Sequence, residues 1–362
     1  MNITFLIGNG FDLNCGLKTS YKDVYNGYCK INETDSELIK NFKKNIKSDY
    51  ETWGDFEWAM AKNINDFKSE DDFVKCLTDF KIYLIKYLSE EKKNFLERYD
   101  NNSVRIVVNQ EISNSINNFY KDVTNNITDN VYKQIKIAKN ITYTFISFNY
   151  TSILYEDIHF KSSSYKFINI HGSLENKDSV LGIDNEKQLN LKNFKLSNKG
   201  RLSFIKPIFN EKYDKNRFVN ANNAIWESDI ICVYGMSLGE SDLTWKKLIT
   251  DWLDYISSDA NKHLFIYDYK NYRKNVYLKD QQMIEEESAK ENFIVEKLKI
   301  EKTNDKFEKY FNKIHMPFKN IFNINETINK IVSNMAKQDK LVKAKLRNSQ
   351  IIGGGSYDIN RF

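Results

Sequence analysis

The residues best able to do chemistry stand at the ends of short apolar runs, and the first group follows the run Ile3–Ile7. Two glycines directly after a buried strand let backbone amides approach a bound diphosphate, and a following helix adds the positive end of its dipole. Leu13 stands where the dinucleotide fingerprint G-x-G-x-x-G has its third glycine, and no G-K-S/T of a P-loop follows. A structural turn with Asp12 as a helix N-cap fits these residues equally. The turn reads Gly8-Asn9-Gly10-Phe11-Asp12.

A histidine and an asparagine follow two other apolar runs. His171 precedes Gly172 at a strand-to-loop corner, and its imidazole suits a general base near neutral pH. Asn149 lies two residues past another run, where its amide can bind a sugar hydroxyl or a carboxamide. A structural histidine and an Asx turn are the alternatives for these two positions.

Two further turns are candidates, one of them for ligand binding. Gly235 and Ser237 lie in a small-residue turn that ends at Asp242, and both phosphate binding and helix capping fit it. Asp55 and Glu57 are two residues apart, so on a helix they point to different sides and form no carboxylate pair. At a helix start they would instead stabilise the helix dipole. The four cysteines never form C-x-x-C and the four histidines do not cluster with them, so no metal site is predicted.

The elements that must position these residues alternate between strand and helix. A helical stretch at 242–257 separates the last two of five β-rich runs, which is the β–α–β rhythm of a parallel sheet. Ligands bind beyond the carboxyl ends of such strands, so the polar turns are expected to meet there. The sequence therefore predicts an α/β fold with a Rossmann-like parallel sheet. Its strands are expected at residues 3–7, 142–147, 165–170, 229–234 and 263–267.

Long polar stretches with apolar residues at helical spacing occupy 34–138, as in 72–88 and 105–138. We therefore expect a helical insertion in a nucleotide-binding domain. The expected division is 1–33 and 139–300 for that domain, 34–138 for the insertion, 301–348 for a helical C-terminal segment and 349–362 for a flexible tail.

Composition excludes some partners. The chain has 54 basic and 49 acidic residues among 362, a net charge of +5 that is too dilute to indicate nucleic acid. Seven of the basic residues are Arg, whose bidentate fork phosphate and base recognition favours. The N-terminal apolar run is too short for a signal peptide, and no stretch approaches the roughly 18 uncharged residues of a membrane span. We expect a cytoplasmic protein that does not enter a membrane.

Five segments, taken in order, resemble the AbiH family of bacterial abortive-infection, anti-phage proteins. They are G-N-G-F-D-L-N-C-G-L-K-T-S-Y-K-D (8–23), W-G-D-F-E (53–57), S-F-N-Y-T (147–151), I-H-G-S (170–173) and V-Y-G-M-S-L-G-E-S-D (233–242). The resemblance extends from residue 3 to about residue 268 and implies an anti-phage effector.

The order strand–G-x-G, strand–x-x-N, strand–H-G and strand–G-x-S-L is also similar to sirtuins and to sirtuin-like NAD hydrolases of phage defence. In sirtuins the first turn receives the NAD diphosphate, the Asn holds the nicotinamide ribose, the His is the catalytic base and the G-x-S loop contacts the adenosine side. A four-cysteine zinc ribbon like that of sirtuins is missing, which argues against protein deacylation. By position, the resemblance assigns NAD binding to Gly8, Asn9, Gly10, Phe11, Gly235, Ser237 and Asp242.

The resemblance implies hydrolysis of the N-glycosidic bond of NAD or a related nucleotide. His171 would polarise a ribose hydroxyl or a water, Asn149 would orient them, and Asp12 would stabilise positive charge on the sugar. Two functions remain open beside it: a nucleotide sensor without turnover, and an RNA-directed nuclease using Asp12, Asp55 or Glu57 with a metal. Because an NAD-depleting enzyme must be silent before infection, we expect a homo-oligomer or a regulatory protein partner.

Overall fold

The centre of the molecule is a six-stranded parallel sheet. The computed structural model describes residues 1–121, 123, 125–154, 164–176, 178–256, 259, 261–267, 279–317 and 319–352. The strands are β1 (Asn2–Ile7), β2 (Thr142–Ser147), β3 (Tyr165–Asn169), β4 (Ile230–Tyr234), β5 (His263–Tyr267) and β6 (Ile314–His315). Their order is β3-β2-β1-β4-β5-β6, and every neighbouring pair is parallel. This is the order of a doubly wound dinucleotide-binding sheet, so the predicted α/β fold is confirmed.

Five of the six strands coincide with the predicted runs. The strand β6 was not predicted, because two residues are too few to show a period of their own. Its neighbour β5 is buried along its whole length, as expected for a parallel strand covered on both faces. Stacked rings link the central strands, with Phe5 and Phe145 at 5.1 Å between centroids and Phe145 and Phe167 at the same spacing.

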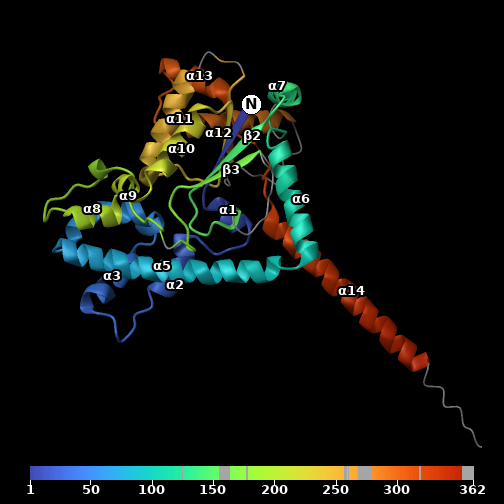
Figure 1. The fold of residues 1–362 in the computed structure, drawn as a ribbon, viewed down its shortest axis with the longest axis horizontal. Coiled ribbons are helices and arrows are strands. Elements are labelled where there is room, and N and C mark those ends of the chain that lie inside the picture. Colours follow the sequence, from blue (N-terminus) through green and yellow to red (C-terminus); the bar gives the residue numbers. More distant parts are fainter. Residues whose placement is uncertain are drawn as a thin grey trace, which may run out of the picture.

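Helices cover both faces of the sheet (Figure 1). One face packs against the end of α5 (Glu70–Tyr99) and against α6 (Asn102–Asn118), α7 (Asn125–Ile137) and α14 (Ile324–Ile352). The other face packs against α10 (Lys215–Trp226), α11 (Leu243–Tyr255), α13 (Asp305–Lys313) and the end of α12 (Lys279–Asn292).

A third hydrophobic cluster lies beside the sheet, where the rings of Phe56 and Phe80 stack at 3.8 Å. It contains residues of α2 (Tyr21–Tyr28), α3 (Glu37–Ser48), α4 (Phe56–Lys62), the first part of α5, the end of α8 (Asn198–Phe204) and the start of α9 (Lys206–Tyr213). The helical stretch at 34–138 therefore contributes to two separate parts of the hydrophobic core. Its first half builds this third cluster, and its second half is one of the layers on the sheet.

The C-terminal segment packs back on the sheet before it leaves the body. Phe322, fully buried, contacts Phe5, Phe11 and Tyr234 edge-on. The helix α14 then runs past α6 and projects from the molecule (Figure 1). Residues 349–352 continue this helix instead of starting the predicted tail, and 353–362 lie outside the described residues.

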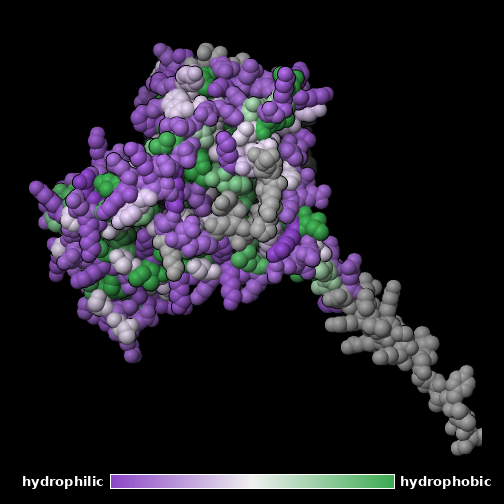
Figure 2. Space-filling view, in the orientation of Figure 1, coloured by the Kyte–Doolittle hydropathy of each residue, from purple (hydrophilic) through white to green (hydrophobic). Residues whose placement is uncertain are grey.

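Hydrophilic residues predominate on the face shown in Figure 2, with hydrophobic ones in small separate patches. In the described part of the chain, no helix has both the length and the apolar character that crossing a membrane requires.

Candidate functional site

A cavity of about 770 Å³ opens at the carboxyl ends of the central strands. Its lining includes the turns after β1 and β4, between which the strand order reverses. This switch point is where doubly wound sheets bind their ligands. Residues following β2 and β3 complete the lining, among them Asn149 and His171.

The glycines of the two turns interlock. A Cβ on Gly10 would lie 2.4 Å from Gly235 Cα, and Gly235 has a φ of +64°, which favours glycine. The N–H of Gly8 donates to the Tyr234 carbonyl and that of Gly10 to the Gly235 carbonyl, both at 2.9 Å. Two of the amides expected to hold a diphosphate thus already have acceptors. Phosphate binding by this turn stays a prediction.

Asp12 is not a helix cap. It lies inside the short helix α1 (Gly10–Asn14), whose N-cap residue is Asn9, and it is 2 % exposed. Thr151 Oγ1 donates to Asp12 Oδ2 at 2.7 Å, and Asn149 Nδ2 donates to Asp12 Oδ1 at 2.9 Å. Burial raises the pKa of Asp12 to about 6, although these two hydrogen bonds and the charge of Lys92 act in the opposite direction.

Asn149 connects this carboxylate to the β1 turn. Besides Asp12, its Nδ2 donates to the Gly8 carbonyl at 3.1 Å. Its Oδ1 is buried and accepts no hydrogen bond from the described residues. The amide is therefore held by its donors and presents a free acceptor, which suits a ligand hydroxyl or a water.

His171 has one ring nitrogen engaged and one free. Nδ1 lies 3.2 Å from the Phe148 carbonyl, and since a carbonyl only accepts, Nδ1 carries the proton. Nε2 is then an unprotonated acceptor, and it is buried without a hydrogen-bond partner in the described residues. Burial, together with the nearby charge of Lys206, holds the pKa of His171 well below its usual range. The ring is therefore neutral at neutral pH, with Nε2 as its hydrogen-bond acceptor.

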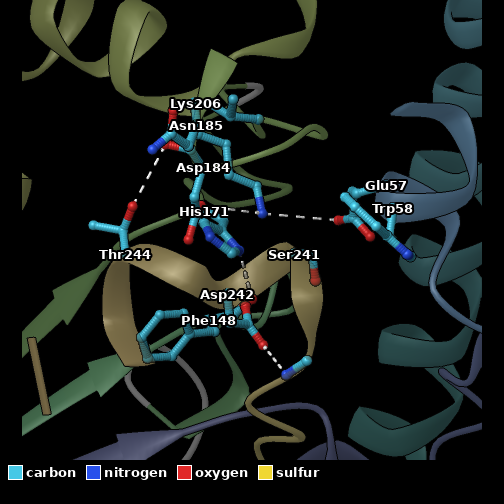
Figure 3. Close-up of polar contacts among 12 residues, drawn as sticks. Glu57, Trp58, Phe148, His171, Asp184, Asn185, Lys206, Ser241, Asp242 and Thr244 are labelled. Atoms are coloured by element: carbon cyan, nitrogen blue, oxygen red, sulfur yellow. Dashed lines mark hydrogen bonds and ion pairs between the residues drawn. The ribbon is translucent and has the colours of Figure 1, made fainter. Parts of the chain in front are cut away.

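Beside His171 lies a group of charged residues that we call the Lys206 cluster: Asp55, Glu57, Asp184, Lys206 and Asp242. Figure 3 shows Glu57, Asp184, Lys206 and Asp242 of this cluster. Lys206 Nζ is 4.0 Å from Glu57 Oε1 and 3.8 Å from Asp184 Oδ1. Tyr21 donates its hydroxyl hydrogen to Glu57 Oε2 at 2.6 Å.

Burial shifts the pKa values in this cluster. It raises the pKa of Glu57 to about 7 and those of Asp184 and Asp242 to about 6, with Lys206 opposing each shift. Burial opposes the charge on Lys206 too, yet the attraction of Asp184 and Glu57 outweighs it and raises the Lys206 pKa.

Most of the residues chosen from the sequence line the cavity, including Asn9, Ser237 and Asp242. Phe11 does not: its side chain is 1 % exposed and packs on Phe322 in the core, because a helical residue next to Asp12 points away from it. The structure therefore places the Phe11 side chain away from the cavity in which the ligand is expected.

Asp55 and Glu57 both line the cavity. The expectation that they stand at a helix start is confirmed, since Asp55 is the N-cap of α4 and Glu57 lies in the first turn of that helix. Lys206 and Asp184 were not predicted, because neither follows a strand or belongs to a motif. For Glu57 the unusual W-G-D-F-E segment was the available signal.

Across the described ranges, no group of three or more His, Cys, Asp or Glu side chains is placed to hold a metal ion. The four cysteines are buried free thiols.

A search of curated proteins finds no match to this chain. The family model for bacteriophage abortive infection AbiH matches residues 4–257, a range that contains both interlocked turns, Asn149, His171 and the Lys206 cluster. Since this match covers more than half of the chain, the protein belongs to the AbiH family of bacteriophage abortive infection proteins.

Proposed function

We propose that this abortive-infection protein binds NAD or a related dinucleotide in the cavity and hydrolyses its N-glycosidic bond. The observation that carries the proposal is the meeting of Asp12, Asn149 and His171 at the switch point of a doubly wound sheet. The volume of about 770 Å³ lies within the roughly 300–1,000 Å³ of small-molecule sites.

In the proposed reaction the bond between the ribose C1′ and the nicotinamide nitrogen breaks. Its electron pair goes to the ring nitrogen, which leaves as neutral nicotinamide, and water adds to C1′. His171 Nε2 takes the proton of that water, for which its free lone pair is suited. Asn149 orients the water or a ribose hydroxyl through Oδ1, and Asp12 stabilises the positive charge on the sugar.

A hydrolase of this kind must be silent until infection. We propose that a homo-oligomer or a regulatory partner imposes this silence. The helices of the third cluster and the projecting end of α14 offer surfaces for such a contact (Figure 1).

The test is nicotinamide release from NAD, followed by chromatography, for the wild type and for His171→Ala and Asn149→Ala. We expect His171→Ala to lower the rate by about 100-fold or more, as for loss of a general base. The control Asn312→Ala removes an exposed amide on α13 and should leave release unchanged.

Full activity of His171→Ala would reject the proposed chemistry. NAD that binds in a calorimeter without any release would instead support a sensor, or an enzyme that awaits its trigger. RNA cleavage that depends on Asp12 or Glu57 and on added metal would move the function to a nuclease.

A further inference from the structure

We propose that the Lys206 cluster is a subsite for a cationic group of the ligand. This inference rests on the proposed function, by which the cationic group is the pyridinium ring of NAD⁺. The cluster would then set specificity for the oxidised dinucleotide and fix the direction in which it lies.

The charges around the cavity are unbalanced. Within the described residues, one ammonium group, that of Lys206, lines the cavity against four carboxylates. Asp184, which does not line the cavity, adds a fifth carboxylate 3.8 Å from Lys206. The four lining carboxylates are Asp12, Asp55, Glu57 and Asp242. A cation entering this buried space is attracted, whereas the anionic diphosphate is repelled and must lie farther away.

Among the described residues, Lys206 makes no close ion pair with the carboxylates around it. The distances from Lys206 to Glu57 and Asp184, 4.0 and 3.8 Å, are longer than direct charge-assisted hydrogen bonds. Asp184 Oδ2 accepts no hydrogen bond from any described residue, although the side chain is 5 % exposed. The cluster is thus an ion network that its own lysine does not saturate.

A second observation points to a ligand at the same place. His171, 6 % exposed, lines the cavity and keeps Nε2 without a partner in the described part of the chain. Figure 3 shows His171 next to Asp184 and Lys206, with Glu57 reaching toward Lys206 from α4. Unpartnered buried acceptors beside excess carboxylates match a ligand group that is cationic and carries hydrogen-bond donors, as the carboxamide of the pyridinium ring does.

The aromatic side chains of the cavity also suit a flat, cationic ligand group. Tyr21, Phe148 and Tyr150 all line the cavity, and aromatic faces attract cations. Cleavage converts the pyridinium into neutral nicotinamide, so the attraction is lost with the product. The cluster therefore favours binding of the substrate over retention of the leaving group, and its loss should raise KM more than it lowers kcat.

The experiment compares two ligands that differ in this charge. Carba-NAD⁺, in which a carbocycle replaces the nicotinamide ribose and blocks hydrolysis, and its reduced form, whose nicotinamide ring is uncharged, are titrated into the full-length protein in a calorimeter. The variants are Glu57→Gln and Asp242→Asn, each isosteric with the residue it replaces. Asp251→Asn is the matched control, since it removes one partly exposed carboxylate of α11 that does not line the cavity and pairs with Lys247. Circular dichroism confirms that each variant is folded.

We expect the wild type and Asp251→Asn to bind the oxidised form roughly 10- to 100-fold more tightly than the reduced form. In each cluster variant that ratio should fall at least about threefold. Equal affinities for the two forms in the wild type, or an unchanged ratio in a folded cluster variant, overturn this inference and leave the proposed hydrolysis standing. Failure of both forms to bind overturns the inference and the proposed function together.

Discussion

Burial raises the pKa of Asp12 and lowers that of His171, and both shifts favour the neutral form of the side chain. Such positions cost stability, because an ionised carboxylate or imidazolium loses its hydration when it enters the protein. Perturbed titratable residues that share a cavity are typical of sites that bind or transform a ligand. Asn149 and Thr151 fix the Asp12 carboxylate with hydrogen bonds, so this carboxylate is held in one orientation.

The raised pKa of Asp12 has a consequence for stability. The folded state holds the Asp12 proton up to about pH 6, and the unfolded state releases it near 3.8. Stability is therefore lost as the pH rises through this window, and Asp12→Asn should remove the loss. Between about pH 5 and pH 8, we expect the free energy of unfolding of the wild type to fall by about 1 kcal/mol more than that of the variant. Urea unfolding at both pH values measures this difference. If the free energy of unfolding depended on pH in the same way in both proteins, the raised pKa of Asp12 would be contradicted.

Gly235 is a position where no other residue fits. A Cβ there would lie 2.5 Å from Gly10 Cα, and the φ of +64° is strained for other residues. We expect Gly235→Ala to lower the free energy of unfolding by about 2–4 kcal/mol, because the two turns must separate. Gly54→Ala is the control, since its Cβ would meet nothing within 4 Å. Equal, small effects for both substitutions would sink the interlocking argument.

At the scale of elements, the long helix α5 connects the two parts of the molecule. Its first part packs in the third cluster through Phe73 and Phe80, and its end packs on the sheet through Phe95 and Tyr99. Ser69 caps its N-terminus by accepting from the Asp72 N–H, and acidic residues in the first turn favour the dipole. The helix thereby holds α4, and with it Glu57, in a fixed place beside the sheet.

The segment before α14 closes one face of the sheet. Phe322 is 0 % exposed among Phe5, Phe11 and Tyr234, and its N–H donates to Ser115 Oγ at 2.8 Å. Phe322→Ala should cost about 3–5 kcal/mol in chemical denaturation, by the cavity it leaves. Ile106→Ala, on an exposed side chain of α6, should change little. A loss below about 1 kcal/mol for Phe322→Ala would show that this segment does not stabilise the sheet.

At the scale of the whole molecule, the cavity lies between the sheet and the third cluster. Asn149 and His171 come from the turns after β2 and β3, and Asp12 comes from α1, which follows β1. Glu57 comes from α4 and Lys206 from the start of α9. A site divided in this way depends on the packing of both parts. Movement between them would change the shape of the cavity.

Because all four cysteines are buried, the reactivity of their thiols measures how often the protein opens. Each thiol is buried, and burial raises the pKa of Cys15 and Cys232 well above the usual value. We expect the native protein to react with a thiol reagent at least about 100-fold more slowly than the urea-unfolded chain, because reaction requires opening. A thiol that reacts rapidly in the native protein would show that its region opens locally.

The sequence determined the strands and the residues that follow them. In a parallel sheet all carboxyl ends lie at one edge, so residues directly after strands, such as Asp12, Asn149, His171 and Gly235, had to meet once the strands were identified. Short apolar runs ending in polar turns were sufficient for that. The orientation of Phe11 away from the cavity and the position of Glu57 beside Lys206 were decided by the tertiary structure. These depend on how helices pack against the sheet, and long-range packing leaves no local pattern that spacing along the chain could reveal.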